Sequence, residues 1–179
     1  MTLNRGLRLA ALLIAGAAFR TVPVLAQATP LPGGASSLQE TYQDWRVACQ
    51  IVNGAKLCAV SQQQVRPDGQ RVLAVELQAA AGDTATGTLV LPFGLLLDAG
   101  VTLQIDDRQA LAPLRFRTCL PAGCVVALSF DNNAVAALRA GATLNLKASA
   151  ADTSQEVTLT VSLTGLAAAL DRNIALERP

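Results

Sequence analysis

Residues 45–64 read WRVACQIVNGAKLCAVSQQQ, and a tight turn is encoded near the middle of this stretch. Asn53-Gly54 favours a two-residue hairpin loop because both positions tolerate the positive φ that such a loop requires. Around that loop Cys49 faces Cys58, on a rung of the ladder where the two strands exchange no hydrogen bonds. Cα atoms on such a rung approach to about 4.5 Å, which is within disulfide range. The stretch predicts a β-hairpin with a Cys49–Cys58 disulfide.

Four cysteines permit three pairings, and a second turn helps to choose among them. Residues 119–124 read CLPAGC, with Pro121 suited to the second position of a turn and Gly123 to the fourth. This geometry favours a Cys119–Cys124 disulfide. The C-x8-C and C-x4-C spacings differ from the C-x-x-C spacing of redox-active pairs, so we interpret both bonds as structural.

Alternation of apolar and polar residues extends the β pattern over most of the chain. Residues 157–163 (VTLTVSL) and 101–105 (VTLQI) alternate without a fault, which is typical of strands with one buried face. Less regular runs occupy residues 45–52, 57–64, 71–78, 88–91, 114–118, 125–130 and 144–148. About nine short strands, separated by Gly, Asn, Asp and Pro turns, predict an all-β sandwich.

Two short segments are expected to be helical. Asn132 and Asn133 can cap residues 134–140 (AVAALRA), and Gly141 is suited to end that helix. Residues 166–172 (LAAALDR) also favour a helix, although a run of this length needs packing to be stable.

Two single residues carry further structural information. Trp45 shares one strand face with Val47 and Cys49, so we expect it in the core rather than at a ligand site. Pro92 interrupts the apolar run at residues 91–94 (LPFG), and because proline cannot donate to a central ladder it predicts a kink or an edge crossing.

The beginning of the chain resembles a secretory signal peptide. Two arginines precede an uncharged apolar run of 11 residues (9–19), which is too short to span a bilayer. Small residues then occupy the positions expected before a signal-peptidase site, either Val24 and Ala26 or Ala26 and Ala28. We therefore expect residues 1–28 to be removed on export.

The remainder divides into a leader and one domain. Residues 29–40 are rich in Pro, Gly and Ser and are expected to be a flexible leader, and residues 41–175 to form the β-sandwich domain. No later apolar run has membrane-spanning length, and the first cysteine, Cys49, is far from the cleavage site. We expect a soluble protein without a transmembrane anchor, located in the periplasm, on the outer membrane or outside the cell.

Composition excludes several classes of function. The chain has no histidine, so a Ser-His-Asp or Cys-His catalytic pair and a histidine-ligated metal are impossible. Lys and Arg number 14 against 13 Asp and Glu and are scattered, which gives no basic surface for nucleic acid. We expect no catalytic, cofactor-binding or metal-binding residues and no nucleic-acid partner.

The remaining candidates for chemistry have simpler structural explanations. Asp106-Asp107 falls short of the six to eight oxygen ligands that Ca²⁺ takes, and we expect a solvated turn there. Arg115 and Arg117 form a small positive strip that either receives an acidic partner or, as we favour, protects a strand edge. Glu76 lies opposite the apolar face of its strand and is expected in solvent.

Several short elements also match a known family in their order along the chain. They are DWRVAC (44–49), CAVSQ (58–62), LPFG (91–94), GVTLQID (100–106), FRTC with GC (116–124) and SLTGL (162–166). Over residues 42–170 the chain resembles the invasion-associated locus B proteins of bacterial envelopes. The resemblance implies an exported β-sandwich of immunoglobulin-like type, associated with host-cell entry in pathogenic relatives, and it supplies no catalytic residues.

Three hypotheses about function follow. The favoured one is a non-enzymatic envelope protein that binds a macromolecule, expected to be a protein, through loops or an exposed edge strand. The second is a periplasmic ligand-binding protein or an enzyme that uses carboxylates only, as glycosidases can. The third is a structural component that assembles by β-augmentation.

Overall fold

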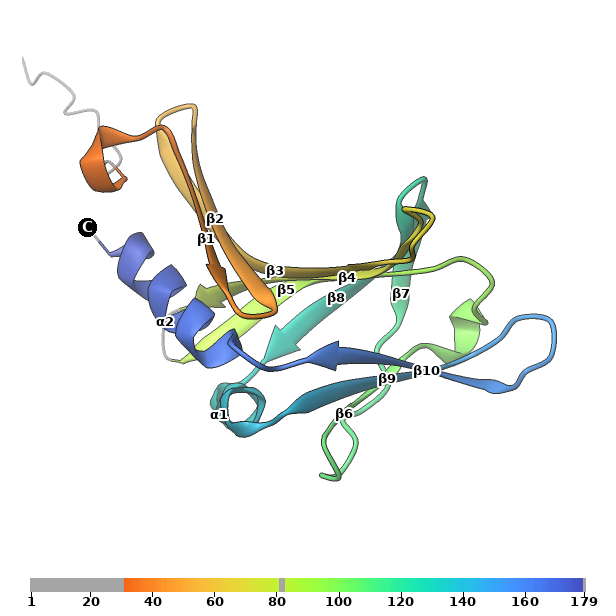
Figure 1. Cartoon of the computed structure of the whole chain (residues 1–179). Coiled ribbons are helices and arrows are strands. Elements are labelled where there is room, and N and C mark those ends of the chain that lie inside the picture. The colour runs from red at the N-terminus through yellow and green to blue at the C-terminus, as the bar shows by residue number, and fades with distance from the viewer. Residues whose placement is uncertain (1–30, 81–82, 179) are drawn as a thin grey trace, which may run out of the picture.

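The computed structural model describes residues 31–80 and 83–178, which form two antiparallel sheets and two helices (Figure 1). The predicted signal peptide, residues 1–28, lies outside these ranges. The strands are β1 (Ser37–Tyr42), β2 (Trp45–Val52), β3 (Ala55–Val65), β4 (Arg71–Ala80), β5 (Thr84–Leu91), β6 (Thr102–Ile105), β7 (Phe116–Leu120), β8 (Gly123–Phe130), β9 (Thr143–Ser149) and β10 (Glu156–Ser162). The helices are α1 (Asn132–Ala140) and α2 (Leu166–Glu177), with 3-10 turns at Pro32–Gly34 and Leu97–Ala99.

The two sheets confirm the predicted all-β sandwich class. The larger sheet has the order β1-β2-β3-β4-β5-β8-β7 and the smaller one the order β10-β9-β6. Strand β5 ends at Leu91, and after Pro92 the chain crosses to the smaller sheet, where Leu95 bridges to Ala150. Proline thus ends one ladder at the point where the chain changes sheets, because it cannot donate a further ladder hydrogen bond.

The core lies between the sheets, and the alternation of each strand decides which residues enter it. In β9, for example, Leu144, Leu146 and Ala148 are buried while the residues between them are half-exposed. Trp45 is 1% exposed, as expected for a core residue.

The larger sheet bends along β3. The first half of this strand pairs with β2 up to Ser61, and the second half pairs with β4 from Val60 onward. Figure 1 shows β1 and β2 standing as a wall, with β4 and β5 running away from it as a floor above the smaller sheet. Helix α2 packs behind the wall against β1, β2 and β3.

Both helices differ in detail from the prediction. Helix α1 is capped by Asp131, whose Oδ1 accepts a hydrogen bond from the Ala134 N–H (2.8 Å), so the two asparagines lie inside its first turn. Asp131 has the extended backbone that a capping residue needs, so the helix begins at Asn132, two residues before the predicted start. Helix α2 continues to Glu177 because its last turns bury Asn173 and Leu176 against the sheet. In the described ranges, neither helix has the length and apolar character needed to cross a bilayer.

The beginning of the fold lies earlier than predicted. Residues 37–40 of the expected leader are part of β1, and Leu31 is 2% exposed. Strand β1 is not among the nine strands that the sequence predicts, because its sequence, SLQETY, contains only two large apolar side chains. Its inward row, Leu38, Glu40 and Tyr42, is half-buried, and this partial burial gives a weak alternation signal.

Candidate functional site

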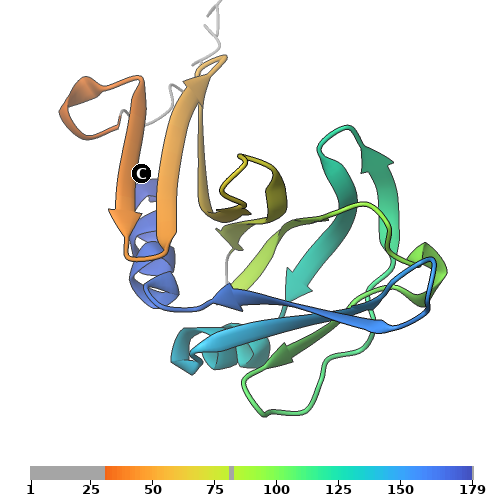
Figure 2. The same ribbon diagram turned by 45° about the vertical axis from the view of Figure 1, so that its right-hand side comes forward.

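Two disulfides close two hairpins of the larger sheet. Cys49 and Cys58 are direct cross-strand neighbours in the β2–β3 hairpin, with Cα atoms 4.0 Å apart. Cys119 and Cys124 occupy the equivalent position in the β7–β8 hairpin, with Cα atoms 3.9 Å apart. These are the pairings that the two turns predict. In Figure 2 the two hairpins rise on opposite sides of the sheet.

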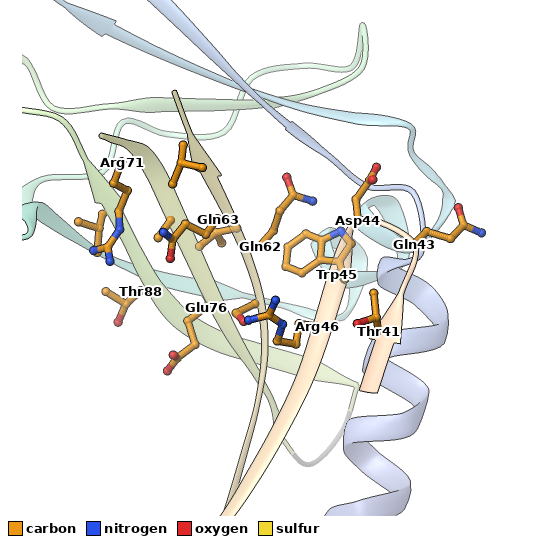
Figure 3. A pocket seen from close by; sticks show the side chains of 15 residues that line it. Thr41, Gln43, Asp44, Trp45, Arg46, Gln62, Gln63, Arg71, Glu76 and Thr88 are labelled. Carbon is orange, nitrogen blue, oxygen red and sulfur yellow. The ribbon is translucent and has the colours of Figure 1, made fainter. Parts of the chain in front are cut away.

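Between the hairpins, the outward face of the larger sheet has a hollow of about 730 Å³, which we call the trough (Figure 3). Its lining consists of Thr41, Gln43, Asp44, Trp45, Arg46, Ser61, Gln62, Gln63, Val65, Arg71, Ala74, Val75, Glu76, Thr88 and Val90. Arg46, Ser61, Glu76 and Thr88 are successive cross-strand neighbours on β2, β3, β4 and β5. Side chains in register share one face of a sheet, so these four form a continuous polar row.

Charged side chains of the trough have no ion-pair partners within the described residues. The two ion pairs found there join Arg139 with Asp171 and Arg172 with Glu40. The charged groups of the trough, Arg46, Arg71, Asp44 and Glu76, take part in neither pair. These groups are therefore available to a binding partner. Glu76 is exposed, as predicted from its strand face.

Exposed apolar side chains lie beside the trough, or in the case of Val65 within it, on the same face of the sheet. Val52, Leu57, Val65 and Leu120 are each 43–54% exposed. Val52 and Leu57 share the strand faces of Arg46 and Ser61, because they lie an even number of residues away. Thr118 pairs with Val125, and Val125 pairs with the trough residue Val90, so these three side chains share one face of the sheet. Leu120 lies two residues after Thr118 and is therefore on the same face. One solvated face is ordinary for an antiparallel sheet, but apolar residues gathered on one hollowed face are typical of interaction surfaces.

Side chains beneath the wall fix the larger sheet to β10. The Trp45 Nε1–H and the Gln62 Nε2–H both donate to the carbonyl oxygen of Ser162, at 2.9 and 3.0 Å. Gln64 Nε2 donates to the carbonyl oxygen of Thr160 at 2.6 Å. These bonds link the end of the trough to the smaller sheet.

A charged cluster holds α2 against β1. Arg172 donates from Nε and from one terminal nitrogen to the two carboxylate oxygens of Glu40, at 2.8 Å each, and the Tyr42 hydroxyl donates to Glu40 at 2.8 Å. Hydrogen bonding from Arg172 lowers the pKa of Glu40, and the Glu40 carboxylate raises the pKa of Tyr42 and of Arg172. The sequence prediction missed this cluster, because Arg172 is far along the chain from Glu40 and Tyr42.

The other candidates have structural roles. Asp106 has a positive φ (47°), and its Oδ1 accepts hydrogen bonds from the N–H groups of Thr143 (2.8 Å) and Ala142 (3.1 Å), so it links the turn after β6 to the start of β9. Across residues 31–80 and 83–178, no three His, Cys, Asp or Glu side chains gather in a way that could hold a metal ion.

Arg115 and Arg117 lie at the β7 edge of the larger sheet, and both are exposed. The register shifts between Phe116 and Thr118, which leaves Arg117 as an unpaired bulge residue. Bulges and positive charges are two of the devices that prevent unwanted strand pairing, and both occur here.

The buried polar side chains in the described part of the chain are Gln62 and Asn173, and neither is a carboxylate. Asn173 accepts a hydrogen bond from the Ala79 N–H (3.0 Å), which links α2 to β4.

Comparisons with known proteins agree with this architecture. Residues 45–173 match the family described as invasion associated locus B (IalB) protein. The chain is 49% identical over 152 residues to an Invasion protein B homolog of Brucella abortus (strain 2308), covering 84% of this chain and 87% of that protein. It is 39% identical over 150 residues to Invasion protein B of Bartonella bacilliformis, covering 83% and 81%.

The same similarity extends to a solved structure. The crystal structure of invasion associated protein B from Bartonella henselae superimposes with a TM-score of 0.74 at 40% identity, covering 78% of this chain and 97% of that one. At these levels of identity and coverage, the chain belongs to the invasion associated locus B family.

Proposed function

We propose that this chain is an exported, non-enzymatic protein of the bacterial envelope that binds another protein across the trough. The observation that carries the proposal is the hollow itself, with unpaired charges in its lining and exposed apolar side chains in and beside it. Protein interfaces combine these features, an apolar part with polar and charged groups around it.

The shape of the trough also supports a macromolecular partner. Small-molecule sites are usually enclosed and lined mainly by apolar and aromatic side chains. The trough is open on its outer side, and amides, hydroxyls and charged groups such as Gln63, Ser61 and Arg46 make up most of its lining. An open surface of this kind is suited to a protein partner rather than to a small ligand.

Export is supported by the cysteines. All four are paired in the structure, and disulfides persist in oxidising compartments such as the periplasm. Relatives from Brucella and Bartonella carry the name invasion protein. We propose that binding at the cell envelope is the role shared with them, and that host entry is its consequence in pathogenic relatives.

Cross-linking in intact cells, followed by identification of the cross-linked proteins, tests this function. The informative variant is Glu76→Arg, which reverses a charge on the trough floor. Its matched control is Glu156→Arg, an identical change at an exposed residue of β10 in the smaller sheet. We expect Glu76→Arg to lose the cross-linked partner and Glu156→Arg to retain it.

The proposal fails if both variants retain the same partner, or if the purified protein carries a small molecule and no protein partner is found. The latter result would favour the ligand-binding alternative.

A further inference from the structure

Three of the four sheet edges in the described residues are blocked. The free carbonyls of β10 at Thr160 and Ser162 accept hydrogen bonds from the side chains of Trp45, Gln62 and Gln64. Natural proteins commonly block edges in this way, because bare edges pair with other chains.

The edges at β6 and β7 are blocked by other means. Beside β6, the Leu111 N–H donates to the carbonyl oxygen of Leu103 (2.8 Å), and Val101 bridges to Leu114. At β7, the bulge at Arg117 interrupts the ladder after only a few residues. Neither edge offers a long regular row of free backbone groups.

Strand β1 is different. It pairs regularly with β2 over all six residues, without a bulge, a proline or a positively charged residue. It therefore lacks the protective devices found at the other edges.

The direction of the free backbone groups on β1 follows from the register. Cys49 and Cys58 face each other on a rung without hydrogen bonds, so the backbone groups of Cys49 point toward Leu38 on β1. The Ile51 N–H, two residues after Cys49, also points toward β1 and donates to the Ser36 carbonyl oxygen (3.0 Å), two residues before Leu38. The N–H and C=O groups of Ser37, Gln39 and Thr41 therefore point away from the sheet, and within the described ranges no hydrogen bond occupies them.

We infer that β1 pairs with β1 of a second copy of this chain, antiparallel and centred on Gln39. A two-fold axis at Gln39 places Ser37 opposite the second copy's Thr41 and Gln39 opposite its own counterpart. All of these residues direct their backbone groups outward, so the symmetric register forms an unbroken ladder. An isologous contact of this type closes as a dimer.

Charge favours an identical copy as the occupant of this edge. About a two-fold axis the same strand face of both copies is brought together, so like charges in that row would repel each other. The outward row of β1 is uncharged, and the inward Glu40 is already neutralised by Arg172. The β7 edge, by contrast, would bring the arginines of two copies together.

Sedimentation analysis of the oxidised protein over a range of concentrations tests this inference. We expect a dimer with a Kd at or below about 1 mM. Gln39→Lys and Gln39→Glu each place like charges across the axis, and each is expected to raise the Kd roughly five- to tenfold. An equimolar mixture of the two variants is expected to recover at least the wild-type association, because opposite charges then face each other.

The control is Gln78→Lys, the same substitution at an exposed residue of β4 that lies neither in the trough nor at a sheet edge. It should leave the Kd unchanged. A monomeric wild type at all concentrations, a mixture that does not recover, or an equal effect of Gln78→Lys would each overturn the inference. None of these results bears on the trough, because the cross-linking experiment has a separate readout.

Discussion

The contact between Glu40 and Arg172 is expected to contribute measurably to stability. An exposed ion pair contributes about 0.2–1 kcal/mol, whereas breaking a fully buried one costs about 3–5 kcal/mol. These side chains are 27% and 32% exposed, respectively, and share two parallel hydrogen bonds of 2.8 Å. The geometry is bidentate and the burial intermediate, so we expect a coupling energy of about 1–2 kcal/mol.

A double-mutant cycle measures this coupling directly. Glu40→Gln, Arg172→Gln and the double variant are unfolded with urea at neutral pH. The coupling energy is the amount by which the two single losses of unfolding free energy, added together, exceed the loss in the double variant. The cycle separates the contact from the apolar packing of the Arg172 side chain against β1.

The same pair makes stability depend on pH. Because the folded protein lowers the pKa of Glu40 from its ordinary value of 4.5, the stabilisation is complete above about pH 4.5. It is lost as the pH falls through the lower pKa of the folded state, because protonation removes the charge that Arg172 binds. The difference in unfolding free energy between wild type and Glu40→Gln should therefore shrink below pH 4.5. A coupling near zero at neutral pH, or a difference that stays constant down to pH 2, would refute the reasoning.

Three further predictions concern other parts of the fold. Asn173→Ala leaves the Ala79 N–H without its acceptor, and urea unfolding should show a loss of about 1–3 kcal/mol, while an unchanged midpoint would contradict the role of that bond. Gly165→Ala places a methyl group against the Tyr42 carbonyl oxygen at a φ of 91°, so its melting temperature should fall clearly below that of an alanine substitution at an exposed site such as Gln63. Reduction of the disulfides, which close loops of ten and six residues, should cost roughly 2–3 kcal/mol each, and peptide mapping without reductant should show the two hairpin pairs and no bond between the hairpins.

Local signals predicted most of the strands. The turn at Asn53-Gly54 sets the register of β2 and β3, and the uninterrupted alternation at residues 157–163 identifies β10. Such features depend on neighbours in sequence, so a single chain displays them. Strand β1 was missed because its sequence, SLQETY, has a weak apolar alternation, and because one of the contacts that hold it, Glu40–Arg172, comes from α2, more than a hundred residues later.

The candidate site was harder to predict than the fold. Each trough residue, such as Arg46 or Glu76, has the polar character of any solvated strand position. What makes these residues a site is the bend of the sheet that brings them around one hollow, and no residue pattern in the sequence reports the angle of a bend. The absence of histidine, in contrast, restricts the possible chemistry from composition alone, because no arrangement of the chain can supply an imidazole group.

The bend in β3 also has a consequence for the binding that we propose at the trough. One continuous strand belongs to both planes, and Val60 and Ser61 are paired on both sides at the corner. Because both neighbours pair with the same two residues, the ladder bonds at the corner oppose a large change in the opening angle. A partner that fits this angle loses little affinity to rearrangement of the receptor, and one that does not fit is rejected by shape rather than accommodated.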